Sequence, residues 1–297
     1  MPSNKPNAVR VTKTLLKSLP LPAPDGDGDK GERGSVLIVG GEVELPGALI
    51  LAGIAALRAG AGKLQLATCK TTAPFVGVSV PECLAAGLDE TKDGTIDVSS
   101  AAKIVDYADD ADATLIGPGL RRSDSNDRLL AKILSDWKRT PLVLDAGALG
   151  ALQRDPGALK MLSGSSIVTP HGGEMANTLG IDKSEIDRYP GSVALDAAST
   201  FNAVVALKGA DTYIASPDGE LYVYQSGKIG LATSGSGDTL AGIVTGLLAR
   251  SASPLRAAVW AVFLHGAAGN VLSKRLGKIG FLARELLDEI PPIMNRL

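Results

Sequence analysis

The 297-residue sequence is short of several residue types that build metal and redox sites. It has two cysteines, two histidines and only 4% aromatic residues. Cys69 and Cys83 lack metal-ligand or redox spacing, so we interpret them as buried or half-buried thiols in a reducing compartment. Two histidines, His171 and His265, cannot form a histidine-rich metal site.

Charge of one sign and long apolar runs are also lacking. The 30 Lys+Arg nearly balance the 32 Asp+Glu, giving a net charge of -2. No basic stripe with interleaved aromatic residues is present, so no nucleic-acid partner is expected. No run of eighteen apolar residues occurs, which predicts no membrane span. The N-terminus lacks the apolar region of a signal peptide, so we expect a cytoplasmic protein.

Three common catalytic motifs are missing. The sequence contains no G-x-x-x-x-G-K-[ST] phosphate loop and no G-x-S-x-G nucleophile elbow. Two close glycine pairs, Gly60/Gly62 and Gly235/Gly237, do not complete G-x-G-x-x-G. A classical dinucleotide-binding fold is therefore disfavoured.

Short apolar strands alternate with helix-forming stretches along most of the chain. This order predicts an α/β fold, with a mainly parallel sheet and helices on both faces. An antiparallel hairpin is expected at 211–224, with its turn at Ser216–Gly219. The expected strands are 36–39, 63–68, 112–116, 142–144, 166–168 and 204–207. The expected helices are 13–19, 48–59, 126–137, 157–162, 192–202, 239–250, 254–274 and 283–289. We expect one domain over 31–297, after a partly irregular segment over 1–30.

In a parallel sheet the strand C-termini share one edge, where ligands bind. Glycines and polar residues follow five of the expected strands, and they should meet at that edge. The segments are Gly40-Gly41, Gly117-Pro118-Gly119, Asp145, Thr169-Pro170-His171 and Lys208-Gly209.

The stretch from Leu231 to Gly242 joins a Ser/Gly loop to a helix expected to begin at Thr239. Glycines at 235 and 237 allow close approach of a ligand, and the helix start favours an anion such as phosphate. Asp238 would repel phosphate unless it holds Mg²⁺ through water or accepts a proton from an attacking hydroxyl. The alternative is that Asp238 is only an N-cap. The helix start is expected to lower the pKa of Asp238.

Four further residues are candidates, and three of them, Lys208, Asp145 and His265, also have a structural interpretation. Lys208 ends an apolar strand, which suits a lysine pointing at phosphate oxygens or an adenine edge, although such lysines are commonly just solvated. His171 sits at the expected binding edge. Asp145 is either a water-held metal ligand or a helix cap. His265 lies on an apolar helix, which favours a packed structural histidine.

These motifs, taken together and in order, resemble the ADP/ATP-dependent NAD(P)H-hydrate dehydratases of the ribokinase-like superfamily. The resemblance covers about residues 30 to 290, and two stretches are specific on their own: Thr169–Glu174 and Gly235–Asp238. The other matching stretches are Val36–Gly41, Pro46–Ala48, Ala56–Gly62, Ile116–Leu120, Val143–Ala146, Leu207–Thr212 and Ala232–Gly242.

The resemblance implies repair of hydrated NADH and NADPH (NADHX and NADPHX): phosphorylation of the ring hydroxyl, followed by loss of phosphate. It implies ADP or ATP as co-substrate, Mg²⁺, and a homo-oligomer, a tetramer. The metal ligands are not identified, and Asp238 is the expected catalytic base. The substrate-binding residues implied are Ala48, Gly119, His171 and Asp238. The nucleotide-binding residues implied are Lys208, Gly209, Ala210, Asp211, Thr212 and Gly237.

Two departures from the family pattern and two alternatives remain. The family commonly has a second acidic residue where Gly147 stands, and too few residues precede Gly31 for the epimerase domain that many relatives carry. We therefore expect the epimerase on a separate chain. The main alternative is a ribokinase-like kinase of hydroxyethylthiazole or hydroxymethylpyrimidine, which tends to have Asn at His171. A non-catalytic nucleotide sensor would not need Asp238.

Overall fold

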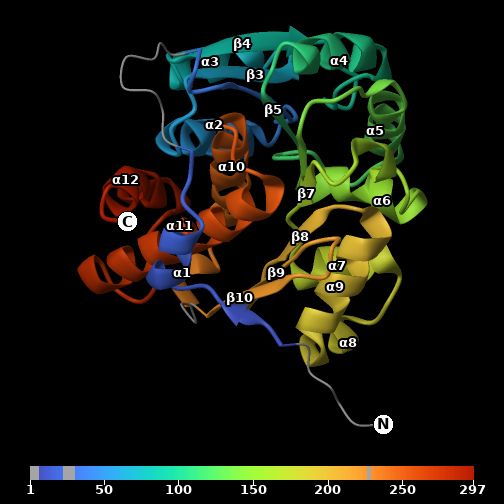
Figure 1. Ribbon diagram of the computed structural model, residues 1–297. Coiled ribbons are helices and arrows are strands. Elements are labelled where there is room, and N and C mark those ends of the chain that lie inside the picture. Colours follow the sequence, from blue (N-terminus) through green and yellow to red (C-terminus); the bar gives the residue numbers. More distant parts are fainter. Residues whose placement is uncertain (1–6, 23–30, 226–228) are drawn as a thin grey trace.

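The computed structural model describes residues 7–22, 31–225 and 229–297, arranged around a ten-stranded sheet (Figure 1). The strand order is β1-β10-β9-β8-β7-β6-β5-β2-β3-β4. All neighbours pair in parallel except β9, which is antiparallel to β8 and β10. The strands are β1 Val9–Arg10, β2 Ser35–Val39, β3 Lys63–Cys69, β4 Cys83–Leu88, β5 Ala113–Ile116, β6 Leu142–Leu144, β7 Ser166–Val168, β8 Val204–Leu207, β9 Asp211–Ala215 and β10 Leu221–Gln225.

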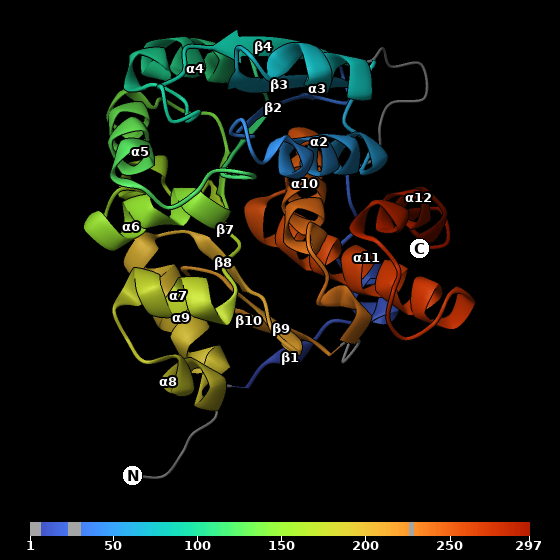
Figure 2. The same ribbon diagram turned by 180° about the vertical axis from the view of Figure 1, so that it is seen from behind.

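Helices cover both faces of the sheet, as the alternating pattern predicts (Figures 1 and 2). One face carries α1 Lys13–Ser18, α2 Pro46–Arg58, α10 Ser236–Ala249, α11 Pro254–Arg275 and α12 Ala283–Met294. The other carries α4 Ala101–Asp109, α5 Asp124–Asp136, α6 Gly150–Arg154, α7 Gly172–Leu179, α8 Lys183–Arg188 and α9 Pro190–Phe201. The short helix α3, Ala73–Ser79, packs beside β3 and β4.

Helices α2 and α10 pack with their backbones in close contact. A Cβ added at Gly242 would lie 2.2 Å from the Ala52 carbonyl oxygen, and one at Gly246 would lie 2.5 Å from that of Ala56. A Cβ added at Gly235, just before α10, would lie 2.4 Å from the Leu51 Cδ1. The contacts advance along both helices in the same direction, so their N-termini lie at the same end. Glycine is required on α10 because any side chain there would separate the helices.

Helix α11 is the one described helix long and apolar enough to cross a membrane by length and composition. However, 67% of its apolar window is buried inside the structure, where it packs against α10 and α12. Trp260 and Arg256 on this helix donate hydrogen bonds to the carbonyls of Leu19 and Pro20, at 2.6 and 2.8 Å. The helix is therefore part of the core, and it fixes the segment that follows α1.

Several expected elements differ from those observed. The strands and the hairpin are confirmed, but α3, β4, α4, α7 and α8 were not predicted. The single helix expected at 157–162 was wrong: α6 precedes it, and only a 3-10 turn, Lys160–Leu162, lies within it. Within 1–30, Val9–Arg10 forms a strand on β10. The Gly/Asp-rich part expected as loop, 25–30, lies outside the described residues.

Candidate functional site

Five loops meet at the C-terminal edge of the parallel strands, as the sequence predicts. Backbone hydrogen bonds join each loop to its neighbour: Gly41 donates to the carbonyl of Pro118 (2.8 Å) and Lys208 to that of Pro170 (2.8 Å). Gly117 packs so closely that a Cβ would lie 1.8 Å from the Asp145 carbonyl oxygen. Together these contacts bring the segments after β2, β5, β6, β7 and β8 into one surface.

Lys208 and Asp145 form the buried centre of this surface. The Lys208 Nζ lies 2.9 Å from Asp145 Oδ1 and 4.0 Å from Glu174 Oε2. Asp145 is 2% exposed, and the same Oδ1 accepts a hydrogen bond from the Thr169 hydroxyl at 2.8 Å. Burial of Lys208 works to lower its pKa, but Asp145 and Glu174 outweigh that effect, so its pKa is raised. Lys208 is therefore held as a fixed cation, and Asp145 is no helix cap, since its side chain makes no capping hydrogen bond.

Helix α10 starts beside this cation. It begins at Ser236, three residues before the expected start, and Gly235 is its N-cap with φ of +85°. Asp238 is thus in the first turn, and the alternative that Asp238 is the N-cap was wrong. A Cβ added at Gly237 would lie 3.1 Å from Lys208 Nζ, so the first-turn backbone and the lysine face the same space. A helix N-terminus and a lysine facing one space form an anion site.

The surroundings of Asp238 raise the pKa of its carboxyl group. Its burial and the nearby Asp145 carboxylate raise the pKa of Asp238 to about 6, while Lys208 acts in the opposite direction. The expectation that the helix start would lower this pKa was wrong, because burial and a second carboxylate outweigh it. A half-buried acid with a pKa near neutrality suits a general base.

His171 occupies the N-cap of α7, and its Nε2 lies 3.5 Å from the Glu174 Oε1. Its Nδ1 accepts hydrogen bonds from the backbone N–H groups of Gly173 (3.0 Å) and Glu174 (3.1 Å). The Glu174 carboxylate in turn accepts a hydrogen bond from the backbone N–H of His171 at 2.7 Å, which completes a capping box. In the neutral ring the proton is therefore on Nε2, and the side chain is 59% exposed. His171 can donate a hydrogen bond to a ligand above the sheet edge.

The other implied residues lie around this centre. Gly119 has a φ of +72°, and a Cβ there would lie 2.4 Å from the Leu45 carbonyl oxygen. Ala48 is in the first turn of α2, at the same end as the α10 N-terminus, and an added Cβ at the neighbouring Gly47 would meet open space. Gly209 and Ala210 form an exposed turn between β8 and β9, followed by Asp211 and Thr212 at the start of β9.

His265 and Gly147 have structural explanations. His265 Nε2 lies 2.9 Å from the Ser236 hydroxyl, and burial lowers the pKa of His265 to about 4. The neutral ring thus anchors the first residue of α10, consistent with a packed structural histidine. At Gly147, a Cβ would lie 2.3 Å from the Leu120 carbonyl oxygen. This backbone therefore has no room for the second acidic residue that the family commonly carries.

The sequence interpretation missed a second polar cluster at the same edge. Glu42 is fully buried and accepts hydrogen bonds from Arg121 Nε (2.6 Å) and Asn126 Nδ2 (2.5 Å). Glu42 directly follows Gly41, and Arg121 stands two residues after Gly119, so both lie just past glycine loops at strand ends, which is the signal that would have found them. No group of three or more His, Cys, Asp or Glu with metal-binding geometry occurs in residues 7–22, 31–225 and 229–297.

Comparison with known proteins gives consistent matches. Residues 36–292 match the family model described as NAD(P)H-hydrate dehydratase. The chain is 47% identical to the ADP-dependent (S)-NAD(P)H-hydrate dehydratase of Xanthomonas campestris pv. campestris, over 98% of both chains. It is 37% identical to a bifunctional NAD(P)H-hydrate repair enzyme of Moorella thermoacetica, covering 93% of this chain and 52% of that one. The Bacillus subtilis ADP/ATP-dependent dehydratase, co-crystallised with ATP/Mg²⁺, superposes with a TM-score of 0.83 at 32% identity, covering 98% and 99% of the two chains.

Proposed function

The chain belongs to the NAD(P)H-hydrate dehydratase family, and we propose that it returns (6S)-NADHX and NADPHX to NADH and NADPH at the Lys208–Asp238 surface. The reaction consumes ADP, or ATP, and releases AMP, or ADP, and phosphate. The enzyme is thus a hydro-lyase. The nucleotide converts the ring hydroxyl, which is a poor leaving group, into a phosphate, which is a good one.

The observation that carries this proposal is the position of Asp238 beside an anion site. The α10 backbone at Gly237 and the Lys208 ammonium face one space, where the terminal phosphate of the nucleotide binds. Asp238 is the next residue in the same turn, and its pKa is about 6. A phosphate and a base are therefore adjacent, as transfer of a phosphoryl group to a hydroxyl requires.

The chemistry proceeds in two steps. Asp238 accepts the proton of the ring hydroxyl while that oxygen bonds to the terminal phosphorus and the bridging P–O bond of the nucleotide breaks. The C–O bond of the phosphate ester then breaks, with its electrons going to the departing inorganic phosphate, and the neighbouring carbon loses a proton, which that phosphate accepts, to restore the double bond. Lys208 balances charge on the transferring phosphoryl group, and the exposed His171 ring is available to contact the hydrate.

Asp145 and Asp238 fit a magnesium ion that is held mainly by nucleotide phosphates. Asp145 contacts the Lys208 Nζ at 2.9 Å, and that ammonium faces Gly237, the residue before Asp238, so one lysine lies beside both carboxylates and only partly balances them. Mg²⁺ in proteins usually keeps several waters and takes one or two carboxylates plus substrate phosphates. When bound, it would neutralise charge on the nucleotide phosphates.

Three further properties are proposed from the resemblance. The protein acts in the cytoplasm, as a homo-oligomer, and with an NAD(P)HX epimerase on a separate chain. The Moorella thermoacetica relative is named as a bifunctional NAD(P)H-hydrate repair enzyme, so that chain carries a second repair activity. This supports a functional link between the two activities.

A substrate panel tests the proposed function. The protein is incubated with Mg²⁺ and either ADP or ATP, together with NADHX, NADPHX, hydroxyethylthiazole or hydroxymethylpyrimidine. Absorbance at 340 nm reports the restored ring, and released phosphate is measured in parallel. We expect one phosphate per restored ring with the hydrates and no phosphorylation of the alcohols. Phosphorylated alcohol without recovery of 340 nm absorbance would assign the chain to the vitamin-precursor kinases instead.

A further inference from the structure

The strand β4, Cys83–Leu88, is an unprotected edge of the sheet. No strand within residues 7–22, 31–225 and 229–297 pairs with its outer side, and both ribbon views show it as the outermost strand (Figures 1 and 2). Proteins usually protect such an edge with a charge, a proline or a bulge, because its free N–H and C=O groups pair with other chains. The residues of β4 include neither a charge nor a proline. At the other edge of the sheet, β10 is covered by the short strand β1.

The backbone groups on the outer side of β4 can be identified from a contact at its end. The Leu88 carbonyl accepts a hydrogen bond from the N–H of Lys70 at 2.9 Å, so the backbone of Leu88 faces β3. Successive residues of a strand turn their N–H and C=O groups to opposite sides. The backbone groups of Cys83, Ala85 and Gly87 therefore face outward.

Two of these outward groups are already bonded within the chain. The Cys83 N–H donates to the Val80 carbonyl at 3.1 Å, and the Gly87 carbonyl accepts from Lys103 Nζ at 3.0 Å. The Cys83 carbonyl, both groups of Ala85 and the Gly87 N–H have no hydrogen bond in the described part of the chain. They are the groups that a further strand would need to meet.

These free groups complement themselves. When Ala85 lies opposite Ala85 of a second, antiparallel β4, the two alanines exchange both N–H···O=C hydrogen bonds. Cys83 then lies opposite Gly87 of the second copy, and the free Gly87 N–H meets the free Cys83 carbonyl, twice by symmetry. The groups left over, the Cys83 N–H and the Gly87 carbonyl, are the two that are already bonded within each chain.

Charges at the two ends of β4 suit the same arrangement. Glu82, directly before the strand, is exposed and has no hydrogen bond or ion pair among the residues that the structure describes. Lys103 Nζ lies on the Gly87 carbonyl near the other end. Antiparallel pairing brings the start of one strand beside the end of the other, so Glu82 of each copy meets Lys103 of the other copy. Asp89, just past that end, is paired with Lys70 at 3.8 Å.

Exposed apolar side chains flank β4 on both of its faces. Phe75 and Val78 on α3 are 73% and 82% exposed, and α3 packs on the strand at Gly77, where an added Cβ would lie 3.3 Å from that of Ala85. Leu84 is on the opposite face and is 60% exposed. Diagonal residues of a strand pair lie about 7–8 Å apart, so the two Leu84 side chains can contact each other. Such a cluster is typical of a protein–protein contact.

We infer that β4 pairs in antiparallel fashion with β4 of a second copy of this chain, joining two ten-stranded sheets into one. A second copy, rather than a different protein, is the occupant because the hydrogen-bonding groups and the charges complement themselves about a two-fold axis. The inference rests on the homo-oligomer proposed above and locates one of its interfaces. It does not depend on the dehydration reaction.

A proline at the centre of the strand tests the backbone pairing. Ala85→Pro removes the central N–H but spares the hydrogen bonds between β4 and β3, because the Ala85 N–H faces outward. Two hydrogen bonds are lost by symmetry, so we expect the dissociation constant of the dimer to rise about thirtyfold. In a tetramer the same variant should leave dimers. Sedimentation velocity over a concentration series measures the mass, and circular dichroism checks that the variant is folded.

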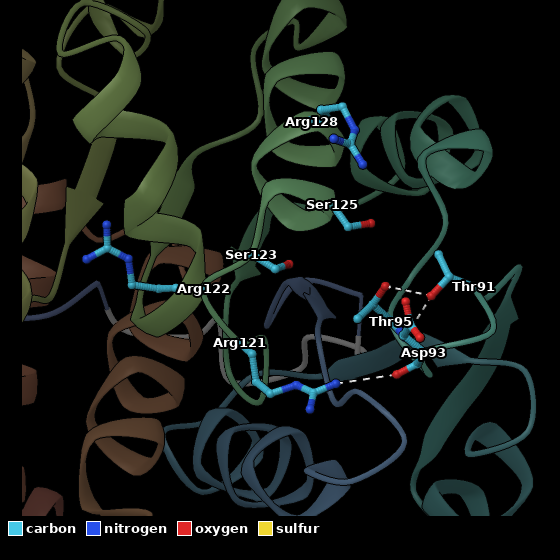
Figure 3. Close-up of a pocket in the computed structure, with 8 residues that line it drawn as sticks. All are labelled: Thr91, Asp93, Thr95, Arg121, Arg122, Ser123, Ser125 and Arg128. Carbon is cyan, nitrogen blue, oxygen red and sulfur yellow. Dashed lines mark hydrogen bonds between the residues drawn. The ribbon is translucent and has the colours of Figure 1, made fainter.

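A charge exchange tests the register with variants that leave the backbone unchanged. Glu82→Lys and Lys103→Glu each bring like charges together at both ends of the pair, so each should raise the dissociation constant about tenfold. The double variant should recover most of that loss. Arg122→Glu is the matched control and should match the wild type. Arg122 follows β5, three strands in from β4, and its side chain donates to Gln153 and points away from the loop 91–95 (Figure 3).

The outcomes separate this inference from the proposed function. A wild-type protein that sediments as a monomer throughout the series would overturn the inference, and so would a folded Ala85→Pro protein with the wild-type mass at every concentration. A double charge variant that associates more weakly than both single variants would overturn the register. A wild-type oligomer that restores no 340 nm absorbance would instead refute the proposed function.

Discussion

Replacing Asp238 by asparagine is the sharpest test of the proposed base. Asp238→Asn keeps the size of the side chain but cannot accept a proton. Loss of a general base typically lowers kcat by about 10²–10⁴-fold, or about 3–5 kcal/mol of transition-state stabilisation. We expect that fall in kcat, with a much smaller change in nucleotide affinity, because Gly237 and Lys208 remain in place.

The pH dependence of kcat/KM reports whether Asp238 must be ionised for the reaction. Only ionised Asp238 can act as the base, and burial beside Asp145 raises the pKa of Asp238 to about 6. The wild-type kcat/KM should therefore rise with pH, about tenfold per unit below the pKa of Asp238, and reach a plateau above it; bound Mg²⁺ would lower that pKa from the value of about 6 in the free protein. This limb should be absent in Asp238→Asn. The rates are measured at 340 nm with saturating Mg²⁺, and nucleotide affinity by calorimetry. Near-normal kcat in Asp238→Asn would refute the assignment, and His171 would be the next residue to test.

Three other predictions follow from the same geometry. Gly237→Val should abolish binding of ADP and ATP in a folded protein, because its side chain would occupy the phosphate's place beside Lys208; calorimetry showing wild-type affinity would contradict this. Asp145→Asn should move the acid limb of kcat/KM to lower pH, because one of the causes that raise the pKa of Asp238 is removed; an unmoved limb would show that Asp145 does not act on the base. Gly242→Val should lower the thermal midpoint by at least several degrees, since overpacking against Ala52 costs about 1–3 kcal/mol or more; an unchanged midpoint would contradict the close packing.

The sheet was predictable because its central strands carry continuous apolar, β-branched runs, as in Val36–Val39 and Val204–Leu207. The strand β4 was missed because Cys83–Leu88 contains no β-branched residue. Helix α7 was missed because it begins with two glycines and is capped by His171 rather than by a usual capping residue.

The edge of the sheet where the site lies also followed from the sequence, because parallel strands place their C-terminal loops together. The raised pKa of Asp238 could not be predicted from the sequence. It depends on Asp145, which is distant in sequence and reaches Asp238 only through the fold, and on burial under the neighbouring loops. The start of α10 at Ser236 was likewise hidden, since Gly235 and Gly237 favour a loop interpretation, whereas in the structure Gly235 packs on Leu51 of α2 and Gly237 on Lys208.

In the proposed mechanism the ring hydroxyl attacks phosphorus, and its oxygen leaves the ring as part of phosphate. NADHX labelled with ¹⁸O in its ring hydroxyl tests this most directly, with ADP and Mg²⁺ in unlabelled water and mass analysis of the released phosphate. Each phosphate should carry one ¹⁸O atom, because the hydroxyl oxygen becomes part of the phosphate before the C–O bond breaks. Unlabelled phosphate, with the ¹⁸O recovered in water, would contradict it and show that nucleotide cleavage and dehydration are separate events.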